Sequence, residues 1–174
     1  MNEKQLFFLW VIICLITHLI RLSYEIFKSR KIILPGKLSF IIILINMTLL
    51  WMSWFELCRL DFYQLNLPDV VRFSGILMFS LGVLVFFISL FTIKSLESYE
   101  GDLITRGIYS KIRHPMYLGF IMWLIGLPVF FESLFSMFLS ILFISNVLFW
   151  RHLEEMELLK RFPEYREYKK STIF

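Results

Sequence analysis

A continuous apolar stretch, residues 73–93, constrains this chain more than any other feature, because it contains no charged side chain. At about 1.5 Å per residue, a helix of this length crosses roughly 30 Å, the thickness of the hydrocarbon core of a bilayer. The alternative is a helix in the core of a soluble domain. However, 58% of the 174 residues are hydrophobic, and a soluble domain of this size could not bury them all. The stretch therefore predicts a transmembrane helix.

Four further apolar stretches predict the rest of the fold. The last two are separated only by Glu132 and Ser133, which indicates a tight helical hairpin. We expect the first to be a retained helix, since no small-residue cleavage pattern follows it. The sequence thus predicts a single domain over residues 1–174, an all-α integral membrane protein with about five transmembrane helices. The four stretches are residues 6–22, 38–55, 116–131 and 134–150.

Two local patterns add detail to this fold. Gly75, Gly82 and Ser89 recur every seven residues and form one small-residue face, which predicts close packing of this helix against another in the membrane. After the last apolar stretch, leucine and methionine recur at helical spacing as far as Phe162, and Pro163 then ends the pattern. We therefore expect the last membrane helix to continue as a cytoplasmic C-terminal helix.

Basic residues predict the orientation. Five lie between residues 21 and 37, four between 94 and 113, and six from residue 151 onward, whereas only Lys4, Arg59 and Arg72 lie elsewhere. With five spans, the three basic regions fall on one side of the membrane. The positive-inside rule makes this side cytoplasmic, with the N-terminus outside and the C-terminal tail in the cytoplasm. Because the basic residues flank lipid-facing segments, they indicate membrane lipids as surroundings and no nucleic acid partner.

Several motifs of known enzymes are absent from the sequence. No G-x-G-x-x-G occurs among the glycines, so no Rossmann domain is expected. Walker, H-E-x-x-H and G-x-S-x-G motifs are also missing, which gives no support to ATPase, zinc-protease or serine-hydrolase activity. Cys14 and Cys58 are expected to be packing residues, and no metal site is predicted.

The polar residues of "RHPMYLG" stand where the fourth apolar stretch begins. Pro115 suits the first turn of a helix, so His114 lies at the helix entrance, where backbone N–H groups and the positive end of the helix dipole attract a carboxylate or phosphate. Arg113 would add donors, and Tyr117 an aromatic face. Alternatively, these residues only anchor the helix at the interface, and Gly119 only serves helix packing.

A second group of charged residues follows the fifth apolar stretch at the same membrane depth. Arg151 and Glu155 are four residues apart, which is typical of a solvated, salt-bridged helix. The alternative is that Glu154 or Glu155 turns inward and meets a cationic ligand near His114.

The order of these motifs resembles a known family. "GDLITRGIYSKIRHPMYLG", a hydrophobic hairpin and "EEMELLKRFPEYREYKK" together resemble the isoprenylcysteine carboxyl methyltransferases and the related phospholipid methyltransferases over residues 94–170. The resemblance implies a membrane enzyme that binds S-adenosylmethionine without a Rossmann domain, in a half of the chain covering about residues 94–174. A lipophilic methyl acceptor would enter from the bilayer.

The resemblance also implies roles for individual residues. By the chemistry of methyl transfer, a carboxylate acceptor needs only a positioning cation such as Arg113 or Arg151. An amine acceptor would have to lose a proton, and a glutamate such as Glu155 would be the natural base. The implied cofactor contacts are Lys94, Gly101, Asp102, Leu103, Ile104, Tyr109, His114, Pro115, Met116, Tyr117 and Glu154.

Two positions depart from the family pattern. Trp150 stands where the eukaryotic enzymes have a substrate-binding arginine, and Phe162-Pro163-Glu164-Tyr165 replaces F-G-x-E-Y. The leading hypothesis is carboxyl O-methylation of a C-terminal S-isoprenylcysteine. The alternatives are N-methylation of a phospholipid amine, methylation of another membrane-soluble small molecule, and a non-enzymatic scaffold or transporter subunit that retains the fold.

Overall fold

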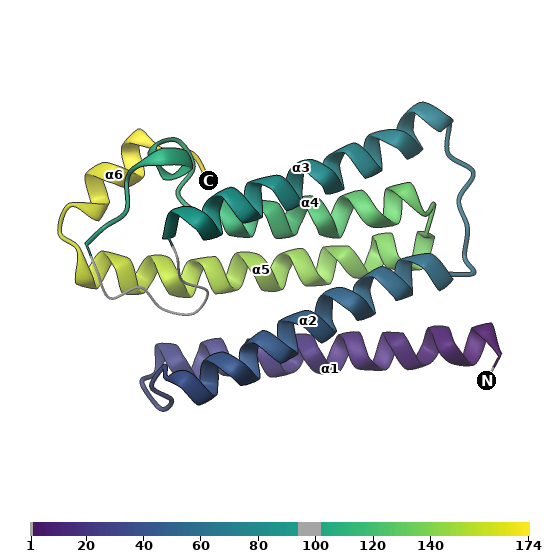
Figure 1. The fold of residues 1–174 in the computed structure, drawn as a ribbon, viewed down its shortest axis with the longest axis horizontal. Coiled ribbons are helices and arrows are strands. Elements are labelled where there is room, and N and C mark those ends of the chain that lie inside the picture. Colours follow the sequence, from purple (N-terminus) through teal and green to yellow (C-terminus); the bar gives the residue numbers. More distant parts are fainter. Residues whose placement is uncertain (1, 94–101) are drawn as a thin grey trace.

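The computed structural model describes residues 2–93 and 102–174, which form an elongated bundle of helices (Figure 1). Within these residues the chain is helical and contains no β-strand, only two isolated bridges. The prediction of an all-α fold is therefore confirmed. The elements are α1 (Glu3–Ser29), α2 (Lys37–Leu60), α3 (Asp69–Ile93), the 3₁₀-helix η1 (Gly107–Ser110), α4 (Pro115–Phe130), α5 (Leu134–Arg161) and α6 (Tyr165–Ser171).

Four of these helices, α1, α2, α3 and α5, are long and apolar enough to cross a membrane. The fifth, α4, has 16 residues and spans about 24 Å at 1.5 Å per residue, so it is shorter than a typical hydrocarbon core. Many large hydrophobic side chains on these helices face outward, among them Leu77 on α3 and Phe138 on α5. An outer surface of this kind suits lipid, because a soluble protein rarely exposes so large an apolar area.

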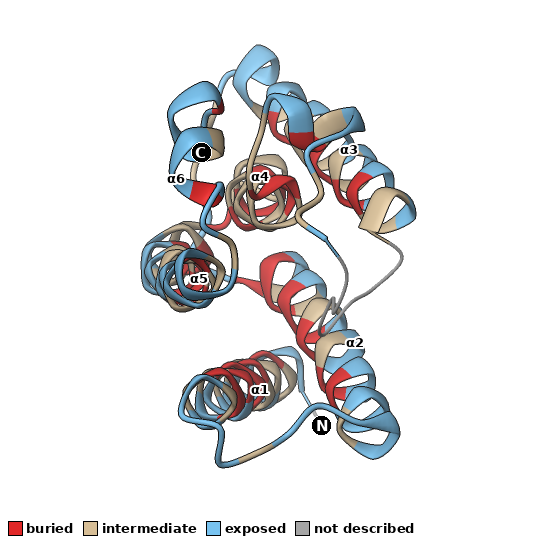
Figure 2. Ribbon diagram, turned by 90° about the vertical axis from the view of Figure 1, so that its left-hand side faces the viewer, coloured by how far each residue is buried: buried red, intermediate tan, exposed pale blue. Residues whose placement is uncertain are grey.

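Seen along the bundle, α4 lies among α2, α3, α5 and α6, and buried residues face the interior (Figure 2). The hairpin of α4 and α5 turns over three residues, of which Glu132 adopts a positive φ of 56°. The predicted tight hairpin is thus confirmed. The core beneath it contains Phe7, Trp54, Leu124, Phe143 and Val147, which come from four helices.

The contact between α3 and α4 depends on glycine. A Cβ on Gly82 would lie 2.8 Å from the carbonyl oxygen of Gly119, and a Cβ on Gly75 would lie 2.7 Å from that of Gly126. No side chain fits at such distances, so the two backbones approach closely only because these positions lack one. The predicted small-residue face is confirmed, and Gly119 serves this helix packing.

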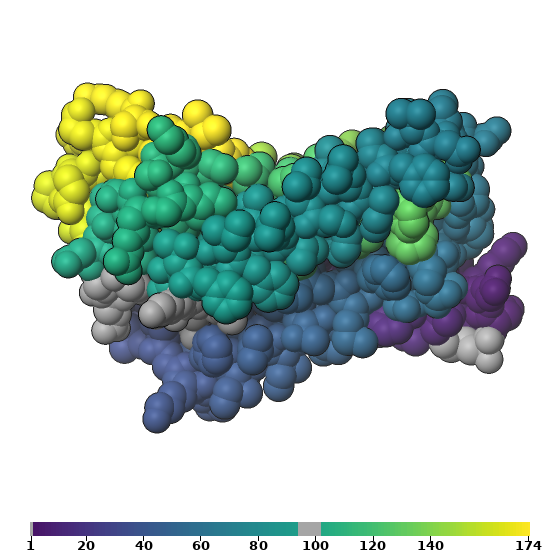
Figure 3. All heavy atoms as spheres, turned by 45° about the horizontal axis from the view of Figure 1, so that its top comes forward, coloured from purple at the N-terminus to yellow at the C-terminus, as the bar shows by residue number. Residues whose placement is uncertain are grey.

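The predicted continuation of the last membrane helix is also confirmed. A single helix, α5, runs from Leu134 to Arg161 without a break, and Phe162 caps it just before Pro163. The following helix α6 and the C-terminal residues turn back and project at one end of the molecule, beside the segment that carries η1 (Figure 3). The loop between α1 and α2, the end of α3 and the start of α4 lie at this same end (Figure 1). The described parts of the three basic regions are therefore gathered there, as the five-span topology predicted.

Candidate functional site

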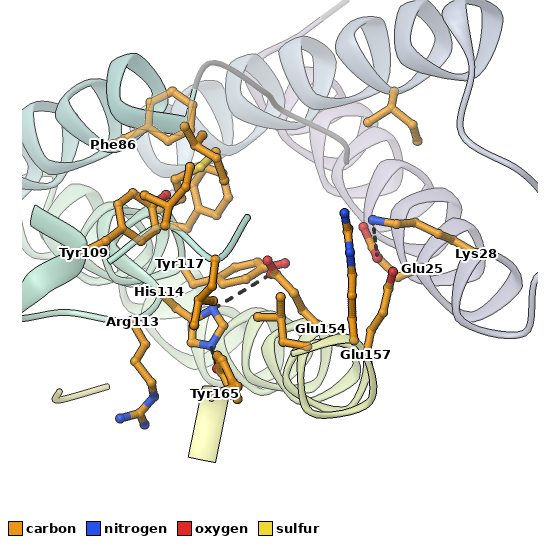
Figure 4. Close-up of a pocket in the computed structure, with 18 of the residues that line it drawn as sticks. Glu25, Lys28, Phe86, Tyr109, Arg113, His114, Tyr117, Glu154, Glu157 and Tyr165 are labelled. Carbon is orange, nitrogen blue, oxygen red and sulfur yellow. Dashed lines mark hydrogen bonds and ion pairs between the residues drawn. The ribbon is translucent and has the colours of Figure 1, made fainter. Parts of the chain in front are cut away.

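A cavity of about 200 Å³ opens at the end of the bundle where the three basic regions meet. Side chains from α1 to α5, from the η1 segment and from α6 line it. Figure 4 shows Tyr109, Tyr117 and His114 on one side of it, Glu25 and Lys28 of α1 on the other, and Glu154 and Glu157 of α5 between them. The N-terminal and C-terminal halves of the chain therefore meet in one site.

The structure brings together most of the residues that the sequence predicts for the site. Lys94 and Gly101 lie outside the described residues. Pro115, Arg151 and Glu155 do not line the cavity. The predicted residues that do line it are Asp102, Leu103, Ile104, Tyr109, Arg113, His114, Met116, Tyr117 and Glu154.

His114 occupies the start of α4, as Pro115 in the first helical turn predicts. Its ring is buried and lies between Glu154 and Glu155 of α5. Nδ1 is 3.9 Å from Oε2 of Glu154, and Nε2 is 3.4 Å from Oε1 of Glu155 and 3.3 Å from the hydroxyl of Tyr165. His114 lies 40 positions before Glu154 in the sequence, and these contacts fix the N-terminal end of α4 to α5.

Glu155 is the centre of a structural network. Its carboxylate accepts a hydrogen bond of 2.6 Å from Nζ of Lys169 and one of 3.4 Å from Nε of Arg113. Nη1 of Arg113 in turn donates to the carbonyl oxygens of Thr172 at 2.6 Å and Lys169 at 3.0 Å. These bonds fasten α6 and the residues after it to α4 and α5. Both Glu155 and Arg113 are therefore largely occupied by holding the C-terminal segment over the site.

Arg151, the other predicted cation, does not line the cavity. Its guanidinium carbon lies 4.7 Å from the ring centroid of Phe174, a cation–π contact with the C-terminal residue. Trp150, one residue earlier on α5, is buried and faces α1. A shift of one residue on a helix turns the side chain by about 100°. Trp150 therefore contacts α1, whereas Arg151 contacts the C-terminal residue.

Three tyrosines line the cavity outside the membrane-spanning helices, two of them unpredicted. Burial, together with the charge of Glu154, raises the pKa of Tyr109 above its usual range, and burial likewise raises the pKa of Tyr165. Burial raises the pKa of Tyr168 to about 12, and its hydroxyl donates a 2.5 Å hydrogen bond to the carbonyl of Tyr109. All three hydroxyls therefore stay protonated near neutral pH and offer aromatic faces and neutral hydrogen-bonding groups.

The sequence analysis also missed three charged residues of α1 that line the cavity, Arg21, Glu25 and Lys28. Arg21 had been assigned to the first basic region after a membrane stretch, but α1 extends to Ser29 and encloses it. One signal was present in the sequence, because an ionisable residue inside an apolar membrane helix usually faces a functional interior.

The described residues contain no group of three or more His, Cys, Asp or Glu side chains placed to hold a metal ion. Cys14 and Cys58 are buried free thiols inside the bundle and do not line the cavity. The polar groups that line the cavity are carboxylates, tyrosines, a histidine, a lysine and three arginines. This set suits an organic ligand that carries both a positive and a negative charge.

Comparison with known proteins shows the family to which this chain belongs. A family model described as phospholipid methyltransferase matches residues 70–165, which span α3 to the start of α6. Protein-S-isoprenylcysteine O-methyltransferase of Rattus norvegicus is 29% identical, over 68% of this chain and 46% of the rat protein. The protein of the same name from Schizosaccharomyces pombe is 37% identical, over 40% of this chain and 30% of the yeast protein.

The matches thus span less than half the length of these two curated relatives. No solved structure matches the chain. The family match nevertheless covers more than half of the chain and includes the start of α4, the hairpin and the glutamates of α5. The chain therefore belongs to the phospholipid methyltransferase family.

Proposed function

We propose that this protein is an integral-membrane methyltransferase that uses S-adenosylmethionine to methylate the carboxylate of a lipophilic acceptor, most like a C-terminal S-isoprenylcysteine. The observation that carries the proposal is the two-sided chemistry of the cavity. Its end near the loops offers carboxylates and tyrosines, whereas Met47, Trp51, Phe86 and Phe120 line it toward the membrane interior. A polar cofactor and an apolar acceptor could meet there.

The polar side fits S-adenosylmethionine. When bound, this molecule supplies an electrophilic methyl group on a sulfonium. Glu154, only half-buried, and Glu157 present carboxylates to the cavity that would bind the cofactor's ammonium or a ribose hydroxyl. Tyr109 and Tyr117 offer faces for the adenine, and the start of α4 at His114 suits the cofactor's carboxylate.

The chain's residues would act by position and not by acid–base chemistry. Methyl transfer is an in-line displacement, so the acceptor, the methyl group and the leaving sulfur must be aligned and shielded from water. A carboxylate is already nucleophilic at neutral pH and requires no base. This agrees with the geometry of Glu155, whose carboxylate is engaged by Lys169 and Arg113 and does not line the cavity.

A second candidate is N-methylation of a phospholipid amine, which the description of the matching family supports. An ammonium must lose a proton before it can attack, so this reaction needs a base. Glu154 and Glu157 face the cavity and would be placed to accept the proton. Glu155 would take this role only if its contacts with the C-terminal segment opened.

We also propose that the end of the bundle carrying the cavity faces the cytoplasm. The basic residues of the loop between α1 and α2, the η1 segment and the C-terminal tail support this orientation, because the positive-inside rule assigns them to one side. The N-terminus of α1 would then be outside. Cofactor from the cytoplasm would reach the polar end of the cavity directly.

Two measurements on the purified protein in detergent test the function. Saturable binding of S-adenosylhomocysteine is expected, and its absence would exclude the enzyme in favour of a scaffold or transporter subunit. Incubation with labelled S-adenosylmethionine and a panel of acceptors then identifies the reaction. Base-labile label on an S-prenylcysteine analogue supports the methyl ester, whereas base-stable label on a lipid amine supports N-methylation.

A further inference from the structure

Arg21 is a buried arginine with free hydrogen-bond donors inside a membrane helix. Its side chain is 9% exposed, and it lines the cavity. Nη2 forms a 2.5 Å ion pair with Oε1 of Glu25, one turn further along α1. Within residues 2–93 and 102–174, however, Nε and Nη1 have no hydrogen-bond partner. Buried donors are normally paired, so most of the N–H groups of this guanidinium are left for something else.

The immediate surroundings do not satisfy these donors. The guanidinium carbon lies 5.4 Å from the ring centroid of Trp150 and 5.6 Å from that of Tyr24. Such contacts stabilise the charge but accept no hydrogen bonds from its edge in the way an oxygen does. The rings therefore orient the guanidinium, and Glu25 partly neutralises it, without using its remaining donors.

The depth of Arg21 suits an acceptor better than the cofactor. Trp150, whose ring Arg21 covers, precedes Glu154 by four residues on α5, which is about one turn, or roughly 6 Å along the helix axis. Because α5 ends at the loop side of the bundle, Arg21 lies about one turn further into the membrane than the glutamate proposed for the cofactor. A carboxylate that enters from the bilayer would meet this arginine.

The other arginines near the site are committed elsewhere. Arg113 donates to two carbonyl oxygens of the C-terminal segment and to Glu155. Arg151 packs on Phe174 and does not line the cavity, although its Nε also has no hydrogen-bond partner among the described residues. Arg161 lines the cavity and packs on the ring of Phe162. Beside Arg21, the apolar side chains of Ile43 and Met47 on α2 line the same cavity and would contact a lipophilic chain.

We propose that Arg21 binds the carboxylate of the methyl acceptor through its free N–H groups, with Trp150 holding the guanidinium in place. The proposal rests on the proposed function. It would explain how a chain with tryptophan at the family's arginine position on α5 can still recognise an acid, since the cation comes from α1 and stands against that same tryptophan. A planar guanidinium is well matched to a carboxylate.

The test compares the affinities of the full-length protein for N-acetyl-S-farnesylcysteine and for its carboxamide, in the presence of S-adenosylhomocysteine. The wild type is expected to bind the acid at least tenfold more tightly. Arg21→Met should reduce this preference to less than threefold and leave the affinity for S-adenosylhomocysteine within twofold of the wild type. Arg59→Met removes an arginine that also pairs with a glutamate of its own helix, Glu56, and should change neither affinity.

Each other outcome has a defined meaning. A wild type without preference for the acid, or an Arg21→Met variant that retains the preference, would overturn the proposal. Loss of S-adenosylhomocysteine affinity in Arg21→Met would also overturn it, by assigning the arginine to the cofactor. If Arg21→Met does not fold, Arg21→Gln is measured in the same way and should likewise lose the preference. Failure of the proposed function is separate, because it appears as a wild type that does not bind S-adenosylhomocysteine.

Discussion

Residues 3–60 and residues 102–174 line opposite sides of one cavity, and they differ in how their charged groups are used. On the C-terminal side, Arg113 and Glu155 are joined to each other and to the tail by hydrogen bonds. On the N-terminal side, Arg21 keeps two nitrogens that have no partner in the described part of the chain. A closed network holds structure, whereas open donors in a buried site are available to a ligand.

The residues covered by the family match follow the same division between the N-terminal and C-terminal sides of the cavity. The match begins at residue 70 and includes the C-terminal side of the cavity, but neither α1 nor α2. Under the proposed function, the C-terminal half would bind the methyl donor, and α1 and α2 would adapt the site to an acceptor. Variants on each side should therefore have separable effects.

The largest effect, on the free energy of unfolding, is expected at the close contact between α3 and α4. Gly82→Leu places a side chain against the Gly119 carbonyl, which a Cβ alone would approach to 2.8 Å. Overpacking at a backbone contact should lower the free energy of unfolding by about 3 kcal/mol or more, seen as a large drop in Tm or loss of monodisperse protein. Gly36→Ala is the control, since nothing lies within 4 Å of its Cβ; an equal loss there would argue against close α3–α4 packing.

The second-largest effect is expected from the removal of His114, the histidine at the start of α4. His114→Ala takes away a buried ring that lies within 4 Å of both Glu154 and Glu155, so the affinity for S-adenosylhomocysteine should fall at least tenfold, about 1.4 kcal/mol. Titration calorimetry measures this. His152→Ala changes an exposed histidine on α5 and should have no effect. Unchanged affinity in His114→Ala would contradict the cofactor assignment.

A smaller loss is expected at the glutamate that faces the cavity. Glu154→Gln retains the shape but removes the charge, so S-adenosylhomocysteine, which lacks the sulfonium but carries the ammonium, should bind about fivefold more weakly, roughly 1 kcal/mol. The same titration with Glu164→Gln, an exposed glutamate beyond α5, serves as the control. If both variants bind like the wild type, Glu154 does not contact the cofactor.

The smallest effect is expected for the arginine that the resemblance suggested as an acceptor contact. Arg151→Met removes a cation that packs on Phe174 outside the cavity, so the KM for a prenylcysteine acceptor should change less than twofold. Steady-state kinetics beside Arg21→Met decide between the two arginines. A larger rise in KM for Arg151→Met than for Arg21→Met would assign acceptor binding to α5. It would also contradict the proposed difference in function between the two halves.

Much of this arrangement could be predicted because the signals are local. Apolar length predicted the membrane helices, the pair Glu132 and Ser133 predicted the hairpin, and Pro115 predicted that His114 stands at a helix entrance. The small face of Gly75 and Gly82 predicted close packing, though not that α4 is the partner. Each of these features depends on residues within a few turns of one another.

The remainder depends on contacts between distant parts of the chain. No local pattern shows that the residues after α6 return to bind Arg113, or that Tyr165 reaches the ring of His114. Nor does the sequence show that α1 ends beyond Arg21 and turns it toward α5. These contacts arise from the rotation and tilt of packed helices, which side-chain periodicity constrains only loosely.

The sequence by itself determined a helical membrane protein with a polar lip at "RHPMYLG" and glutamates at matching depth, because hydrophobic length and helical spacing are properties of single segments. The tertiary structure decided which charged groups face the cavity. Arg21 and Trp150 lie far apart in the chain, and their contact exists only once α1 has packed against α5. The distinction between a guanidinium that fastens the fold and one that is open to a ligand is therefore a property of the packed bundle.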